Sequence, residues 1–123
     1  MDDEISPEEV EALLESDDPP RVVDIRSPGA FGRGHIPGSE NVPFGDLPDR
    51  IESFAGADRI VTVCPHGKAS VQAARLIKSY DGTADARVES MTGGLEAWSG
   101  DLVADDGDDA GAPDEEEPPE SPF

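Results

Sequence analysis

Short apolar runs alternate with longer amphipathic segments along the first hundred residues of the chain. Four short segments predict strands: 21–25 and 59–63, which are rich in branched apolar residues, and 40–43 and 87–90, which hold one valine each. Three segments with apolar residues at helical spacing predict helices: 6–15, 46–54 and 70–80. Because strands and helices alternate, we expect an α/β fold with an open, mainly parallel central sheet flanked by helices.

Caps and breakers mark several boundaries of these elements. Ser6 is followed three residues later by Glu9, a capping box that predicts the start of the first helix. Residues 17–20, with two prolines, end that helix. The glycine-rich residues 29–38 are expected to form a loop, and Gly82 is expected to end the helix that begins near residue 70.

The end of the folded domain is also marked in the sequence. Gly93 and Gly94 predict a close approach of two backbone segments, before a helix that contains Trp98. We expect Trp98 to pack in the core. Residues 104–123 are acidic and nearly free of apolar side chains, so we expect one domain at 1–103 and a disordered tail at 104–123.

Cys64, the only cysteine, directly follows the predicted strand 59–63. At the carboxyl end of a parallel strand a side chain faces a crevice, and the N–H groups of the next turn and helix favour a thiolate. Cys64 is therefore a candidate nucleophile; the alternative is a small buried apolar residue. Asp24 and Arg26 lie at the carboxyl end of the predicted strand 21–25, on the same rim of the sheet as Cys64. There they either take part directly in the chemistry or form an ion pair that fastens loops.

Several short segments match one family pattern in order and spacing. They are Asp24-Ile-Arg26, the stretch 31–38 with Asn41-Val-Pro43, the loop Cys64-x-x-Gly67-x-x-Ser70, and Gly93-Gly94 with Trp98. Together they resemble the rhodanese (sulfurtransferase) family over about residues 5–100. The resemblance implies the fold of that family.

The resemblance also implies a two-step sulfur transfer. The Cys64 thiolate would take a sulfur atom from a small donor such as thiosulfate, and the resulting persulfide would pass it to a thiol or a protein acceptor. No cofactor and no metal are implied. The implied substrate-binding residues are His66, Gly67, Lys68, Ala69, Ser70, Arg26 and Asp24.

Two positions differ from the residues that the family usually carries. Ala30 stands where a glutamate is usual, and Ala69 where many members have an arginine. Lys68 or His66 could supply a cation instead, although a lysine offers a point charge rather than a fork. These differences keep open a non-catalytic rhodanese-like interaction or regulatory domain. A phosphatase with a related cysteine loop is disfavoured, because the position that would need arginine is Ser70.

The chain is strongly acidic, with 29 acidic and nine basic residues and a net charge of −20. The first 100 residues alone hold 19 acids and all nine bases, of which only two are lysines. An acidic, lysine-poor body resembles proteins of salt-accumulating halophiles; an ordinary acidic bacterial protein is the alternative. Nucleic acids and anionic membranes are not expected as partners, because both would be repelled.

Compartment and metal binding can also be predicted. One cysteine excludes an internal disulfide, and the acidic start has no apolar signal segment, so we expect a cytoplasmic protein. No segment has the roughly 20 apolar residues that cross a bilayer. A structural zinc site needs four ligands, whereas Cys64, His35 and His66 are the only soft ones. We expect no metal, and we expect His35 to be a residue that supports the site from behind or one that fastens a loop.

Overall fold

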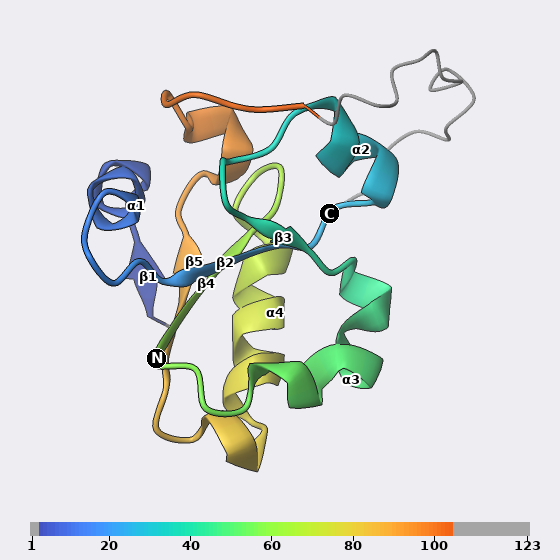
Figure 1. The fold of residues 1–123 in the computed structure, drawn as a ribbon. Helices are drawn as coiled ribbons and strands as arrows, with labels where there is room; N and C mark the ends of the chain where they lie inside the picture. Colours follow the sequence, from blue (N-terminus) through green and yellow to red (C-terminus); the bar gives the residue numbers. More distant parts are fainter. Residues whose placement is uncertain (1–2, 105–123) are drawn as a thin grey trace.

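The computed structural model describes residues 3–104 of the 123-residue chain, and a five-stranded parallel sheet lies at its centre (Figure 1). The strand order is β1-β5-β4-β2-β3, and every pairing of neighbours is parallel. The strands are β1 (Glu4–Ile5), β2 (Arg21–Asp24), β3 (Glu40–Asn41), β4 (Arg59–Val63) and β5 (Arg87–Met91). The predicted α/β fold with an open parallel sheet is therefore confirmed.

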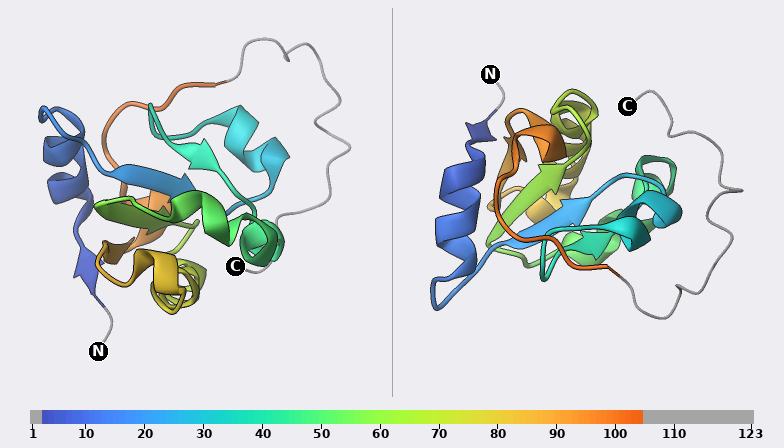
Figure 2. Two further views of the ribbon diagram at one scale, coloured as in Figure 1. Left: turned by 60° about the horizontal axis from the view of Figure 1, so that its bottom comes forward. Right: turned by 90° about the horizontal axis from the view of Figure 1, so that it is seen from above.

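Helices cover both faces of the sheet (Figure 2). The α-helices are α1 (Pro7–Leu14), α2 (Pro28–Arg33), α3 (Leu47–Arg50) and α4 (Ala69–Lys78). Four short 3-10 helices are η1 (Phe44–Asp46), η2 (Ile51–Phe54), η3 (Asp81–Thr83) and η4 (Gly94–Ala97). The α1 helix packs on one face and α3 and α4 on the other, which gives two apolar layers.

Alternation along β4 divides the core between the two faces. Ile60 packs with the residues of α4 and η2, whereas Val61 and Val63 pack on the side of α1. Successive strand residues point to opposite faces, so Cys64, directly after Val63, points back to the α4 side. The register pairs Asp24 with Val63, which aligns the carboxyl ends of β2 and β4.

Two parts of the predicted secondary structure are wrong. The stretch 29–38 is not all loop, because Pro28–Arg33 forms α2. Ser27 caps this helix by accepting a hydrogen bond from the Ala30 N–H, and Pro28 occupies its first position, so these signals outweigh the glycines. Gly82 does not end α4; the helix ends at Lys78 and Gly82 lies in η3.

Smaller differences concern short elements. The two-residue strand β1 was not predicted, because it is too short for any alternation to show. The predicted helix 46–54 is divided into α3 and the 3-10 helices beside it. Trp98 lies just after η4 rather than inside a helix, and its indole packs against the apolar layer on the α1 side.

The end of the predicted domain lies beside α2. Val103 and His35 exchange both backbone hydrogen bonds, each at 2.9 Å, in an isolated bridge. The predicted tail 104–123 lies outside the described residues apart from Ala104, so the boundary and the tail stay predictions. Among the helices of residues 3–104, none has the length and apolarity needed to cross a membrane.

Candidate active site

Cys64 lies between β4 and α4 and has no solvent-exposed surface. Its Sγ accepts hydrogen bonds from the backbone N–H groups of Gly67, at 3.0 Å, and Ser70, at 3.3 Å. Gly67 lies in the turn that leads into α4, and Ser70 is the second residue of that helix. Because N–H groups direct positive partial charge at the sulfur, this turn stabilises a negative charge on Sγ.

Three side-chain hydroxyl groups fix the start of α4 to the strands β4 and β5. The Cys64 thiol donates to Ser70 Oγ at 3.4 Å, and Ser70 Oγ lies 2.6 Å from Ser90 Oγ on β5. Thr62 on β4 donates to the Ser70 carbonyl at 2.7 Å. All of these side chains are buried, so the first turn of α4 is fixed to the two strands beneath it.

Glycines let two loops meet above the strand ends. Gly67 has φ +88°, and a Cβ at this position would lie 2.7 Å from the Gly93 nitrogen. Gly94 has φ +63°, and a Cβ there would lie 2.5 Å from the Pro65 carbonyl oxygen. Both φ values favour glycine, and both contacts leave no room for a side chain. The predicted close approach at Gly93 and Gly94 is therefore confirmed.

The η4 helix closes this contact with two hydrogen bonds. The Leu95 N–H donates to the Cys64 carbonyl at 2.9 Å, and the Glu96 N–H donates to the Pro65 carbonyl at 3.1 Å. The orientation of the cysteine backbone thus depends on a segment about thirty residues further along the chain.

The remaining predicted loop residues lie at different depths. His66 and Lys68 are exposed on the outer side of the loop, and His66 Nδ1 lies 3.2 Å from Glu96 Oε1. The Ala69 side chain packs in the core with α4, so only its backbone is available to a ligand. The structure thus brings Gly67 and Ser70 to the sulfur and leaves His66 and Lys68 around it.

Asp24 and Arg26 form a buried ion pair at the end of β2. Arg26 Nε and Nη2 donate to both Asp24 carboxylate oxygens, at 2.8 to 3.1 Å. Arg26 Nη2 also donates to the Gly34 carbonyl at 2.7 Å, which ties β2 to the end of α2. This geometry matches the loop-fastening alternative that the sequence left open.

A cavity of about 330 Å³ lies beside the cysteine loop. Its lining residues are Arg26, Ala30, Arg33, Gly34, Pro65 and Leu102. The two charged residues among them are arginines, so the cavity suits an anion. Arg33 was not predicted as a site residue, because it falls in the stretch predicted as loop. The available signal was that Arg33 is the only arginine or lysine between Arg26 and Arg50.

His35 fastens the chain after α2, as expected. Its ring stacks on Phe31 with a centroid distance of 3.8 Å, and Nδ1 lies 2.7 Å from the Phe31 carbonyl oxygen. Across residues 3–104, no three histidine, cysteine, aspartate or glutamate side chains stand close enough together to hold a metal ion.

Comparison with known sequences gives matches over most of the chain. Residues 6–101 match the family model of the rhodanese-like domain. The chain is 38% identical to thiosulfate sulfurtransferase GlpE of Pseudomonas aeruginosa over 101 residues, which cover 82% of this chain and 87% of GlpE. It is 29% identical over 97 residues to the putative sulfur carrier protein YrkF of Bacillus subtilis, covering 79% of this chain and 51% of YrkF.

Solved structures share the fold. A rhodanese-like domain protein from Staphylococcus aureus superposes with a TM-score of 0.72 at 25% identity, covering 83% of this chain and 97% of that one. The rhodanese-like domain of an Anabaena protein gives a TM-score of 0.72 at 27% identity, covering 91% of this chain and 88% of that domain. With the family model matched over residues 6–101 and the fold shared, this chain belongs to the rhodanese-like domain family.

Proposed function

We propose that this chain is a sulfurtransferase or sulfur carrier that moves sulfane sulfur through a persulfide on Cys64. The observation that carries this proposal is the Sγ of the only cysteine, held at the end of β4 by the N–H groups of Gly67 and Ser70. Relatives named as a thiosulfate sulfurtransferase and a putative sulfur carrier support the same class of reaction.

In the first step the Cys64 thiolate attacks the outer sulfur of thiosulfate. A new S–S bond forms on Cys64, the S–S bond of thiosulfate breaks, and sulfite leaves with the bonding electron pair. The negative charge ends on the terminal sulfur of the persulfide, so no outside oxidant or reductant is required. The N–H groups around the turn stabilise this charge.

In the second step a nucleophilic acceptor attacks the outer sulfur of the persulfide. The S–S bond of the persulfide breaks, and Cys64 leaves as a thiolate ready for another donor. Because the chain has no second cysteine, the acceptor must be a separate molecule, either a small thiol or a protein. The acceptor in turn decides whether the chain works as an enzyme or as a carrier.

The cavity beside Pro65 supports an anionic donor. Arg26 and Arg33 line it, and Lys68 is exposed on the neighbouring loop. In a chain with a net charge of −20, local positive charge beside the nucleophile offsets the general repulsion of an anion. We assign recognition of the anionic group to Arg33 and Lys68, and the support of both loops to Arg26.

The complete burial of Cys64 favours a second candidate, a non-catalytic interaction domain. The two are separated by the mass of the intact protein after incubation with thiosulfate in high salt. We expect the protein to gain the mass of one sulfur atom, and Cys64→Ser to lose both this adduct and turnover. A mass that never changes, with a thiol that still reacts with an alkylating reagent, would support the interaction domain instead.

A further inference from the structure

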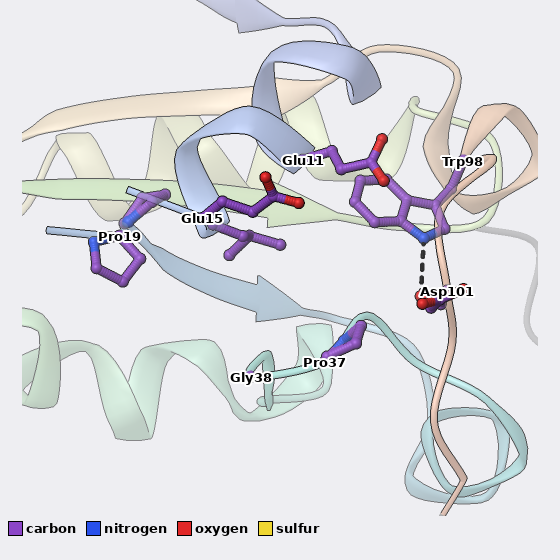
Figure 3. Close-up of a pocket in the computed structure, with 9 residues that line it drawn as sticks. Glu11, Glu15, Pro19, Pro37, Gly38, Trp98 and Asp101 are labelled. Carbon is purple, nitrogen blue, oxygen red and sulfur yellow. Dashed lines mark hydrogen bonds between the residues drawn. The ribbon is translucent and has the colours of Figure 1, made fainter. Parts of the chain in front are cut away.

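A second cavity, of about 340 Å³, lies on the α1 side of the molecule (Figure 3). It is enclosed by α1, the segment after α1, the turn at Pro37 and Gly38, and the chain from Trp98 to Asp101. None of the residues that line it belongs to the Cys64 loop. The cavity is therefore separate from the site described above.

The cavity has apolar residues on two sides, and one of them, Trp98, is held in place by its own contacts. Pro19 and Pro37 lie across the cavity from the Trp98 indole (Figure 3), and Leu14 also lines it. The indole packs on the α1-side core, and its Nε1 donates to the Asp101 carbonyl at 3.1 Å. An indole fixed in this way offers a preformed face to a ligand.

The charged residues that line the cavity are all acidic: Glu11, Glu15 and Asp101. In Figure 3 the carboxylates of Glu11 and Glu15 both point toward Trp98. Neither carboxylate has a hydrogen-bond or ion-pair partner within residues 3–104. A cavity with apolar walls and only negative charge is complementary to a cation on an apolar stem.

The placement of these two glutamates is unfavourable for α1 itself. Glu11 and Glu15 are four residues apart, so their like charges repel along one side of the helix. Glu15 is the C-cap, and the last turn of α1 holds no basic residue to balance the negative end of the helix dipole. A cation bound between the two carboxylates would relieve both effects.

We propose that this cavity is a docking site for a basic segment of a partner protein, with one arginine side chain seated between the Trp98 indole and the carboxylates of Glu11 and Glu15. A planar guanidinium stacks on an aromatic face and donates to two carboxylates at once, which an ammonium does less well. Its aliphatic stem would lie along Leu14 and the prolines.

The site lies one short element away from the reactive loop. Trp98 directly follows η4, and η4 donates hydrogen bonds to the carbonyls of Cys64 and Pro65. A protein docked here would contact the chain just after η4, so it could act on the sulfur chemistry through the segment that holds the Cys64 backbone. That role of the partner rests on the proposed function, whereas the docking itself does not.

Trp98 is the only tryptophan, so its fluorescence reports directly on this cavity. A blocked Gly-Arg-Arg-Gly peptide, titrated at the lowest salt at which the chain melts cooperatively, is expected to give a saturable change in indole emission. The double variant Glu11→Gln/Glu15→Gln should weaken binding about tenfold, since two exposed ion pairs are lost. The variant Asp49→Asn/Glu52→Gln, with the same net charge but changed on α3 and η2, should bind like the wild type.

The outcomes separate this site from general attraction and from the sulfur chemistry. Equal weakening in both double variants, or an emission that does not change, would overturn the proposal. Binding of spermidine as tight as that of the peptide would assign the cavity to a small polyamine and would also overturn the proposal. A dimer that Glu11→Gln/Glu15→Gln abolishes would assign the cavity to a second copy of the chain, with the same consequence. We expect Cys64→Ser to bind the peptide as the wild type does. The docking test can therefore succeed or fail independently of the persulfide proposal.

Discussion

At the scale of single residues, the sulfur depends on a chain of hydroxyl groups. Ser70 Oγ stands between Cys64 Sγ and Ser90 Oγ, and each contact can run in either direction. When Cys64 is a thiol, its S–H donates to Ser70. When Cys64 is a thiolate, Ser70 can turn to donate to the sulfur and accept from Ser90, so the pair adapts to the charge.

Replacing Ser70 tests this pair. Ser70→Ala should lower the rate of sulfur transfer about tenfold, because a donor to the anionic sulfur is lost. It should also cost about 1–3 kcal/mol of unfolding free energy, because the buried Ser90 hydroxyl loses its partner. Urea unfolding of Ser70→Ala, Ser90→Ala and the double variant measures this, and the double variant should cost less than the two single losses together. Fully additive losses would argue against a coupled pair.

Arg33 and Lys68 are the basic residues proposed to bind the anionic donor. Arg33→Gln and Lys68→Ala should each raise the KM for thiosulfate about threefold to tenfold, with little change in kcat, if they bind the anionic donor. Initial rates with thiosulfate and with an uncharged organic polysulfide give the comparison. Arg50→Gln removes an exposed arginine on α3 and serves as the control. A loss of equal size for both donors would show that the effect is structural.

At the scale of elements, the reactive loop is shaped by η4 as well as by the strand and helix that flank it. The N–H groups of Leu95 and Glu96 hold the carbonyls of Cys64 and Pro65, and glycines permit the approach. Movement of η4 would therefore move the sulfur relative to its donors.

Gly94→Ala is the direct test of this coupling. The added methyl group would lie 2.5 Å from the Pro65 carbonyl oxygen, at a residue with φ +63°. We expect a loss of about 3 kcal/mol or more of stability and a larger loss of activity, measured by thermal unfolding and initial rates. Gly45→Ala is the matched control: it meets nothing within 4 Å, has no positive φ and should leave both quantities near the wild type. A Gly94→Ala protein with normal stability and rate would refute the coupling.

At the scale of the whole molecule, charge dominates. The first 100 residues alone have a net charge of −10, so repulsion is a property of the folded part as well as of the acidic end. Folding should therefore strengthen as salt is raised from about 0.1 M to several molar KCl, because the screening length falls from about 10 Å to below 3 Å. Thermal melts at each salt concentration check this. A stability that is highest at low salt would remove the halophilic interpretation, which stays a prediction, as does the cytoplasmic location.

Deleting residues 104–123 separates the two sources of charge. The truncated chain should keep its fold, its activity and most of its salt dependence, because the repelling charge of the first 100 residues remains. Val103 stays in place, and with it the hydrogen bonds to His35. A large drop in melting temperature on truncation would mean that the removed segment docks on the domain.

Local patterns in the sequence are enough to predict the α/β fold, the main strands and helices, and the position of Cys64 between β4 and α4. These are local properties, since apolar spacing and a capping box act within one element. Gly93 and Gly94 also predicted a close approach of two backbone segments, but they did not predict that the other segment is the Cys64 loop.

The surroundings of the sulfur and of the second cavity, in contrast, could not be predicted from local patterns. Ser90 on β5 bonds to Ser70 on α4, Arg33 and Pro65 line one cavity, and Trp98 lines another with residues of α1. These residues are 20 to about 90 positions apart, and no local pattern encodes which of them meet. Their meeting follows from the order and register of the strands and from the packing of helices on the sheet, because contacts between distant residues form only when the whole core is assembled.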